Sequence, residues 1–240
     1  MSRKTLFALL VLLLIVLAPF TVLPALLESA AARILQDQLG LQETPEVEIE
    51  SSPAPMMYAG SFSKALVSVK GVKIGGVKPE KVVIELDPFD LNLLESMTSG
   101  AVSTEQPLSG KLLVELSEAS ALRLAQAGST VPVQGIEFEE DQVVLRLALG
   151  FGAPTSVRGR LFLKDELLIF EPQHVDEAPS LVTPEQVLAV TGFAYPTSGL
   201  PFATSGLSFG VKVSGVDVRK DRVTLSGEIK KIPLGGIPAG

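Results

Sequence analysis

The sequence predicts an α+β fold in which a long N-terminal helix packs in a highly curved antiparallel β-sheet. Three observations predict it. One amphipathic helical segment comes first, and alternating apolar strands then dominate the chain, interrupted only by short helices. A shift in the phase of the alternation, repeated in three strands, indicates that the sheet is bent.

The helical segment is "ALLESAAARILQDQLG", residues 25–40. Its apolar side chains follow the spacing of one helix face: Leu26, Leu27, Ala30, Ala31, Ile34, Leu35 and Leu39. We expect a helix of about 15 residues, roughly 22 Å long, which ends at Gly40. Such a wide apolar face requires a cover.

Strand patterns follow a Pro-rich loop at Pro53 and Pro55. The strand at 67–74 is expected to pair with 82–86 across the turn "GGVKPE". Later strands and hairpins are expected at 111–116, 131–149, 160–170 and 207–229. In all, the pattern predicts about eight to ten antiparallel strands.

Two short helices interrupt these strands. The segment 117–128 has Ser117 at its N-cap and Gly128 at its end. The segment 183–192 begins with Thr183 as cap and Pro184 at the first helical position, and Gln186 completes a capping box.

The phase shift occurs in "VSVKGVKI" (67–74), "VPVQGIEF" (131–138) and "VKVSGVDV" (211–218). In each, apolar residues change parity after a glycine: Gly71, Gly135 and Gly215. A β-bulge produces this pattern, because one extra residue bends the strand and increases its twist. The alternative is that each glycine only marks a hairpin corner.

Composition excludes several classes of function. The net charge is −7 and the chain has no Trp and only two Tyr, so neither phosphate neutralisation nor base stacking favours a nucleic-acid partner. The absence of Cys excludes disulfides and thiolate metal sites. The mean hydropathy of +0.38 indicates that much apolar surface is buried or touches something apolar.

The N-terminus carries Arg3 and Lys4 and then no charge from Thr5 to Leu27. A basic start before an apolar run is typical of an export signal, and a run of this length could also span a bilayer. We expect residues 1–24 to be a signal peptide or an N-terminal membrane anchor, with the anchor slightly favoured. Residues 25–232 are expected to form a single domain and residues 233–240 a flexible tail.

Catalytic patterns are present but lack their context. "GLSFG" places Ser208 in a nucleophile-elbow pattern, yet a strand follows it and no histidine lies downstream. Ser61 and Lys64 have a serine–lysine spacing, but the segment leads into a strand. The single histidine, His174, has no partner ligands nearby in sequence. We therefore predict no enzyme, no metal site and no cofactor.

The segments "PAPMMYAGSFSKALVSVKGVKIGGVKPEKVVIELDPFDL" (53–91) and "LPFATSGLSFGVKVSGVDVRKDRVTLSGEI" (200–229), together with the preceding exported helix, carry a family resemblance. The chain resembles the LmeA-like family of bacterial envelope phospholipid-binding proteins, from about residue 26 to 229. The resemblance implies a TULIP-like fold, phospholipid binding outside the cytoplasmic membrane, and support of cell-envelope assembly. It supplies no catalytic residues.

On this basis we predict a protein of the periplasm or cell envelope, and residues 5–27 are the candidate membrane anchor. The protein is expected to bind phospholipid or another acyl lipid between the helix and the curved sheet. Burial of acyl methylenes at about 0.8 kcal/mol each would drive binding. The predicted lining residues are Leu27, Ala31, Ile34, Leu35, Val67, Val69, Ile84, Val211 and Val213. The same residues would form an ordinary dry core in a structural or interaction module of the envelope, which is the alternative. The sequence does not identify protein partners.

Overall fold

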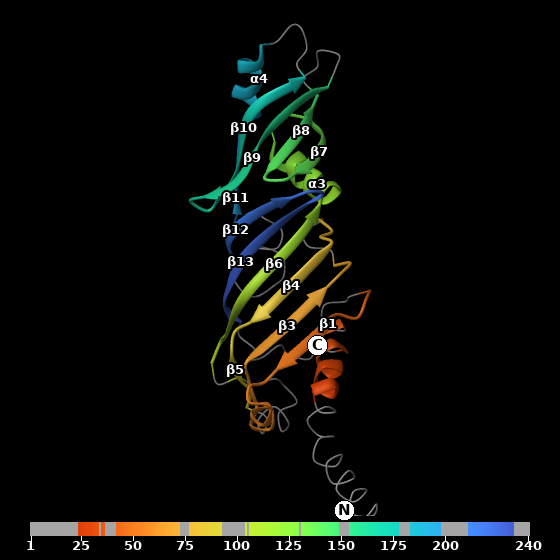
Figure 1. Ribbon diagram of the computed structural model, residues 1–240, viewed down its shortest axis with the longest axis vertical. Helices are drawn as coiled ribbons and strands as arrows, with labels where there is room; N and C mark the ends of the chain where they lie inside the picture. Colours follow the sequence, from red (N-terminus) through yellow and green to blue (C-terminus); the bar gives the residue numbers. More distant parts are fainter. Residues whose placement is uncertain are drawn as a thin grey trace, which may run out of the picture. The chain divides into compact units, whose positions relative to one another are not determined.

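The computed structural model describes residues 24–33, 35–36, 42–72, 77–92, 104, 106–129, 131–148, 154–177, 183–197 and 211–232. The first elements, shown in Figure 1, are β1 (Glu46–Glu50), the 3-10 helix η1 (Ala54–Ala59), β2 (Ser61–Phe62), β3 (Lys64–Val69), β4 (Lys81–Leu86), β5 (Phe89–Asp90), β6 (Leu108–Ser117) and α3 (Glu118–Gly128). The remainder are β7 (Val133–Glu139), β8 (Gln142–Leu147), β9 (Thr155–Lys164), β10 (Leu167–Glu177), α4 (Pro184–Thr191), β11 (Phe193–Pro196), β12 (Val211–Arg219) and β13 (Arg222–Ile232).

The strands of the described residues form three sheets. Their orders are β1-β3-β4-β6-β13-β12, β11-β10-β9-β8-β7 and β2-β5. The predicted pairing of 67–74 with 82–86 is confirmed in outline, because β3 and β4 are neighbours. The described part of the chain is thus mostly β-sheet with a few helices, which is compatible with the predicted α+β class.

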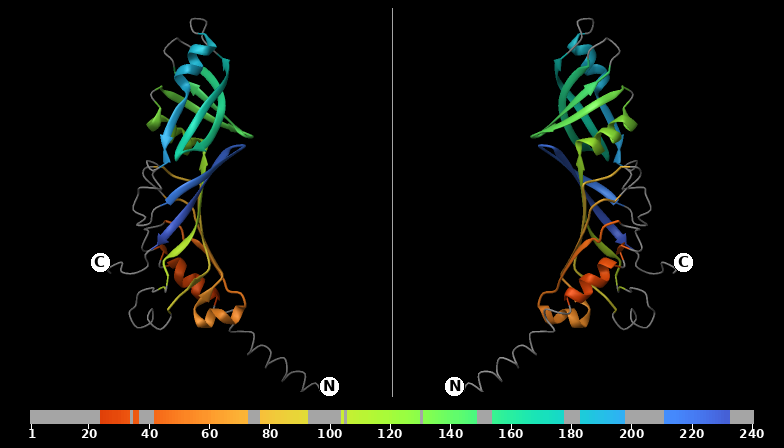
Figure 2. Two further views of the ribbon diagram at one scale, coloured as in Figure 1. Left: turned by 90° about the vertical axis from the view of Figure 1, so that its left-hand side faces the viewer. Right: turned by 90° about the vertical axis from the view of Figure 1, so that its right-hand side faces the viewer.

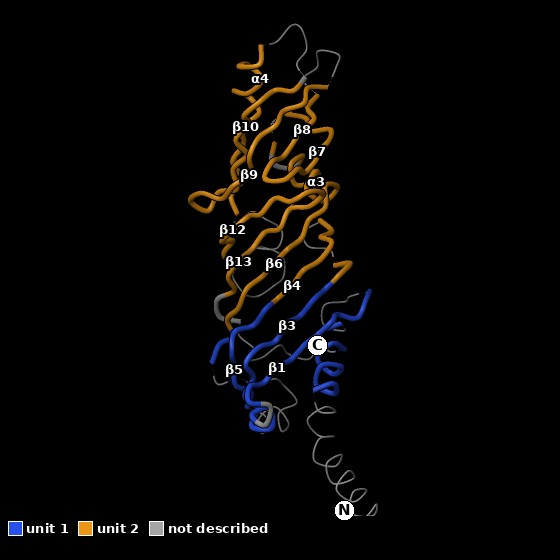
Figure 3. Tube along the Cα trace, viewed as in Figure 1, with its two compact units in different colours: residues 1–69, 85–108, 233–240 blue, residues 70–84, 109–232 orange. Residues whose placement is uncertain are grey.

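The chain divides into two compact units (Figure 3). Unit 1 comprises residues 1–69, 85–108 and 233–240, and unit 2 comprises residues 70–84 and 109–232. The prediction of a single domain over residues 25–232 stays a prediction.

Unit 2 contains the five-stranded sheet, which curls as a half barrel (Figure 2). Helix α3 contacts β7 at one edge of this sheet, and α4 contacts β10. Strand β12 also contacts β7, β8 and β9. The fully buried side chains of unit 2 include Leu145, Val157 and Phe170, so the core of this unit lies on the inner side of the curled sheet.

The predicted bulges are confirmed at two of the three glycines. The register shifts between Val133 and Gly135 in the β7–β8 pair, and between Val213 and Gly215 in the β12–β13 pair. At Gly215 a Cβ atom would lie 2.6 Å from the Ser226 hydroxyl, so the close approach of the partner strand favours glycine.

The bulge predicted at Gly71 is wrong. Strand β3 ends at Val69, and Gly71 follows it in a bend with φ of 72°. A left-handed backbone is accessible to glycine at little cost, and it turns the chain out of the strand. Here the glycine marks a strand end and not a bulge.

Both short helices lie where the sequence predicts them. In α4 the Thr183 hydroxyl accepts a hydrogen bond from the Gln186 amide, and the Gln186 side chain accepts one from the Thr183 amide, so the capping box is confirmed. In α3 Ser117 occupies the N-cap position and the helix ends at Gly128. The Ser117 side chain makes no capping bond, however, and donates instead to the Ser120 hydroxyl at 3.4 Å.

Residues 24–33 and 35–36 are helical, beginning one residue before the segment 25–40 predicted as the long N-terminal helix. Its full length is not shown, because residue 34 and residues 37–41 lie outside the described residues. Leu27, Ala31 and Leu35 are half-buried as the stripe predicts, whereas Leu26 and Ala30 are exposed. The buried stripe is therefore narrower than the apolar pattern. None of the helices in the described part of the chain is long and apolar enough to cross a membrane, and residues 1–23 lie outside that part.

Unit 1 is organised around the antiparallel pair β1–β3, in which Val47 lies opposite Val67. Phe62 of β2 stacks on Phe89 of β5 with ring centroids 5.2 Å apart. The main-chain amide of Ser63 also donates to the carbonyl of Glu50. These contacts fix the segment between β1 and β3, which includes η1.

Candidate functional site

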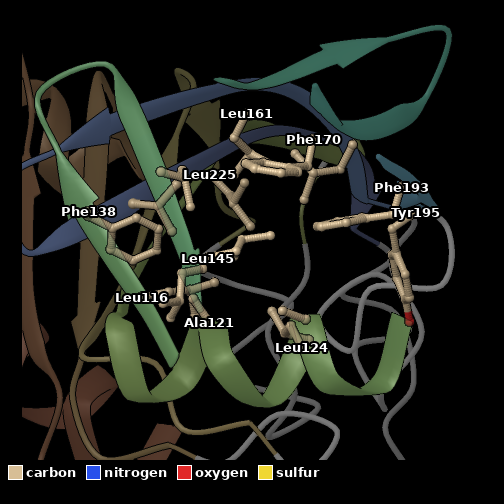
Figure 4. Close-up of a pocket in the computed structure, with 15 residues that line it drawn as sticks. Leu116, Ala121, Leu124, Phe138, Leu145, Leu161, Phe170, Phe193, Tyr195 and Leu225 are labelled. Carbon is tan, nitrogen blue, oxygen red and sulfur yellow. The ribbon is translucent and has the colours of Figure 1, made fainter. Parts of the chain in front are cut away.

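Unit 2 encloses an apolar cavity with α3 on one side and the curled sheet on the other (Figure 4). Among the described residues, fifteen line it, and all of these belong to unit 2. They are Leu116, Ala121, Leu124, Ala125, Ile136, Phe138, Val143, Leu145, Leu161, Leu168, Phe170, Phe193, Tyr195, Val223 and Leu225.

Helix α3 is fixed along β7 by side chains at both of its ends. Near its start the Glu118 carboxylate accepts a hydrogen bond of 2.9 Å from the amide of Phe138. Near its end the Gln126 amide donates to the carbonyl of Val133, also at 2.9 Å. Ala121, Leu124 and Ala125 share one helix face by their i, i+3, i+4 spacing. The two clamps therefore hold this face toward the cavity.

The opposite wall comes from the inward-facing residues of the strands. Phe138 of β7 and Leu145 of β8 point toward α3, and Leu161 of β9 and Phe170 of β10 continue the wall (Figure 4). Alternation along each strand places these side chains on one face. Leu225 of β13 adds a further apolar group.

Gly159 of β9 makes room for the largest of these side chains. A Cβ atom at Gly159 would lie 2.7 Å from Cζ of Phe170 and would also clash with the carbonyl oxygen of Glu171. The missing side chain thus lets the Phe170 ring lie against the β9 backbone. From there it stacks on Phe193 of β11, with centroids 5.5 Å apart and ring planes inclined by 20°.

Strand β11 and helix α4 position the aromatic end of the cavity. The α4 capping box fixes the helix start, and Val187 of α4 is fully buried. At the other end of β11, both the amide and the hydroxyl of Thr197 donate to the carbonyl of Glu166 at 2.9 Å. These anchors hold Phe193 and Tyr195, which extend toward the cavity from the side facing the end of α3 (Figure 4).

The chemistry of the cavity is almost wholly hydrocarbon. None of the fifteen lining residues is charged, and the Tyr195 hydroxyl is their only polar side-chain group. The cavity volume is about 50 Å³, several times the roughly 10–15 Å³ that one water molecule needs. Water there would find few partners, so the site favours an apolar occupant.

Charged groups with shifted pKa values lie at the surface of unit 2. The Asp176 carboxylate, with Glu139, raises the pKa of Arg158, and Glu166 raises the pKa of Lys212. Asp217 raises the pKa of Arg219. Each shift comes from an ion pair, and none of these residues lines the cavity. The arrangement offers the cavity no acid–base group with a perturbed pKa.

The nine residues predicted as lipid contacts lie elsewhere. In unit 1 Val69 is buried, and four residues are half-buried: Leu27, Ala31, Leu35 and Val67. In unit 2 Val213 is buried, and Ile84 and Val211 are half-buried. Ile34 lies outside the described residues. None of the eight that are described is among the residues that line the cavity. Their assignment as lipid contacts stays a prediction.

The candidate catalytic residues gain no further support. The ammonium group of Lys64 lies 3.1 Å from the Glu85 carboxylate, and Ser208 lies outside the described residues. The His174 side chain is 71% exposed and 3.8 Å from Asp176. Within the described ranges no group of three or more acidic or histidine side chains is placed to hold a metal ion.

Comparison with known proteins identifies the family. A model of LmeA-like phospholipid-binding proteins matches residues 21–228, which is most of the chain. Searches of curated proteins and of solved structures found no match, so the TULIP-like likeness stays a prediction. The matched family is one of lipid-binding proteins and not a class of enzymes. The resemblance in the sequence is thus confirmed, and the chain belongs to the LmeA-like phospholipid-binding family.

Proposed function

We propose that this is an exported or membrane-anchored protein that binds phospholipid, takes up acyl chain between a helix and the curled sheet, and supports assembly of the cell envelope. The observation that carries the proposal is the apolar cavity between α3 and the five-stranded sheet in a chain of a phospholipid-binding family. In this proposal the helix that covers the bound acyl chain is α3 and not the N-terminal helix.

The energetics favour hydrocarbon over headgroup in the cavity. Each buried methylene contributes about 0.8 kcal/mol, whereas a charged phosphate without a partner would cost several kcal/mol. Since the described residues that line the cavity include no charged one, the headgroup stays outside it. A volume of about 50 Å³ accommodates the end of a chain rather than a whole lipid.

A structural or interaction module with a filled core is the second candidate. The observation that favours it is the small volume of the cavity, about 50 Å³, against several hundred Å³ for a typical ligand site. In this reading Ala121 and Leu124 complete a dry core, and the protein acts through its surface.

Extraction of the purified protein distinguishes the two candidates. The full chain is prepared without detergent in its last steps, extracted with organic solvent, and the extract is analysed by mass spectrometry. The lipid-binding proposal predicts co-purified phospholipid near one molecule per chain. A folded protein that carries no lipid and takes up none from added vesicles would favour the structural module.

A further inference from the structure

The segment between β1 and β3 combines two unusual properties. From Ser51 to Ser63 it contains no charged residue, although Glu50 and Lys64 flank it directly. Within it two large apolar side chains are exposed, Met56 at 44% and Tyr58 at 46%. These two side chains can contact an apolar medium without any charge in the loop having to lose its water.

Main-chain hydrogen bonds and one buried side chain hold the loop in a conformation in which Met56 and Tyr58 are exposed. Met57 between them is only 6% exposed and anchors η1 to unit 1. The amide of Met56 donates to the carbonyl of Pro53 and that of Gly60 to Met57, each at 3.0 Å. At the base of the loop the Ser51 hydroxyl donates to the carbonyl of Ser61 at 2.7 Å.

Unit 1 also contains the described end of an uncharged N-terminal run, from residue 24 onward. Thr5 to Leu27 carry no charge, and Leu26, at the end of that run, is 61% exposed. Two residues later the Glu28 carboxylate accepts a hydrogen bond of 3.1 Å from the amide of Ile49 in β1. This bond ties the helical segment to the strand that leads directly into the 51–63 loop. Leu26 and the 51–63 loop therefore belong to one compact unit (Figure 3).

We propose that Met56 and Tyr58 insert into the interfacial layer of the lipid bilayer that holds residues 5–27. The inference rests on the membrane association proposed above. An uncharged loop enters this layer without desolvating a charge, and Tyr is enriched at the membrane interface. Two displayed side chains are far short of the roughly 1,000 Å² that a stable protein partner needs, but they suffice to orient a body already held at a membrane.

Charge around the loop sets the expected type of binding. Glu46, Glu48 and Glu50 of the neighbouring strand β1 are exposed, and the flanking Lys64 is paired with Glu85. An anionic headgroup would gain little attraction from this surface. The contact should therefore be hydrophobic and change little with ionic strength, unlike a basic patch, whose attraction salt screens.

The lack of any Trp in the chain allows a direct test. Tyr58→Trp and, separately, Met56→Trp are introduced into the full chain, which is reconstituted into phosphatidylcholine–phosphatidylglycerol vesicles and recovered by flotation. Val190→Trp, at a residue that is 53% exposed on α4 of unit 2, is the matched control. The proposal predicts blue-shifted emission at positions 56 and 58, quenched at least twofold by brominated phospholipid at both low and high salt, and little quenching at 190.

Three results would overturn the proposal. The first is floated protein in which Trp at positions 56 and 58 is not quenched, and the second is equal quenching at all three positions. The third is a blue shift that appears without vesicles when the protein concentration is raised. The last would assign the loop to self-association. Lipid extraction is independent of these readings, so failure of this contact is distinguishable from failure of phospholipid binding in the cavity.

Discussion

The backbone amide of Asp141 donates a hydrogen bond of 3.2 Å to the carbonyl of Val218, and the reciprocal bond joins Asp221 to Phe138 at the same distance. The two hairpins that they link are related in sequence. Residues 133–147 recur 80 positions later as 213–227, with Val, Gly, Asp, Val and Leu at the same places. Both copies have the same bulge and the same register. The β7–β8 and β12–β13 hairpins are thus two copies of one unit, joined turn to turn.

These turn bonds predict unusual protection from hydrogen exchange. Amides in hairpin turns normally exchange fast, but those of Asp141 and Asp221 are bonded to the other hairpin. We expect the amides of Asp141 and Asp221 to exchange at least about ten times more slowly than the amide of Asp165 in the β9–β10 turn. Exchange monitored by NMR measures this, and equal rates at all three amides would contradict the turn-to-turn pairing.

Backbone conformation at these turns predicts a second result. Asp141 and Asp221 have φ of 61° and 67°, where alanine is strained by about 1 kcal/mol and glycine is not. Asp221→Ala is therefore expected to lower the free energy of unfolding by about 1 kcal/mol relative to Asp221→Gly. Urea denaturation of the two variants measures the difference. The same stability in both would show that the turn is not held in this conformation.

Gly159→Ala tests how the aromatic wall is built. The new methyl group would meet the Glu171 carbonyl and the Phe170 ring at less than 3 Å, so a loss of about 1–3 kcal/mol is expected. Gly135→Ala in β7 is the matched control, because its nearest neighbour is the Arg146 side chain at 3.5 Å. Urea denaturation should place the control near the parent protein. An equal loss in both would mean that Gly159 has no special role.

The start of α4 predicts a dependence on pH. Hydrogen bonds from its own backbone amide and from Thr183 lower the pKa of Glu185 below its usual 4.5. A carboxyl whose pKa is lowered on folding stabilises the protein above its unfolded pKa, and this contribution is lost as pH falls through the folded pKa. The stability difference between the parent and Glu185→Gln should therefore be present at pH 7 and shrink below pH 4. A difference that is constant across this range would contradict the assignment.

Local features of the fold could be predicted from the sequence because short-range chemistry determines them. The bulges at Gly135 and Gly215 and the Thr183–Gln186 capping box follow from residues a few positions apart. Gly71 was misassigned because the same glycine signal serves a bulge and a strand end.

The cavity could not be located in this way. Its position depends on which helix covers the sheet, and long-range contacts such as Glu118 to Phe138 and Gln126 to Val133 decide that. A weaker signal was available, because Ala121, Leu124 and Ala125 form one apolar face of a short helix. The sequence analysis instead assigns the lipid contacts to the N-terminal segment, because that segment has the longer apolar helical pattern.

Filling the cavity tests the central claim most directly. Ala121→Leu extends a buried, cavity-lining side chain into the void, whereas Ala119→Leu adds the same atoms at an exposed position of the same helix. The measurement is native mass spectrometry of the full chain after incubation with phosphatidylglycerol vesicles. We predict a lipid-bound species for the parent protein and Ala119→Leu, and at least a tenfold smaller bound fraction for a stably folded Ala121→Leu. Equal lipid occupancy in all three proteins would contradict the assignment of this cavity as the acyl-chain site.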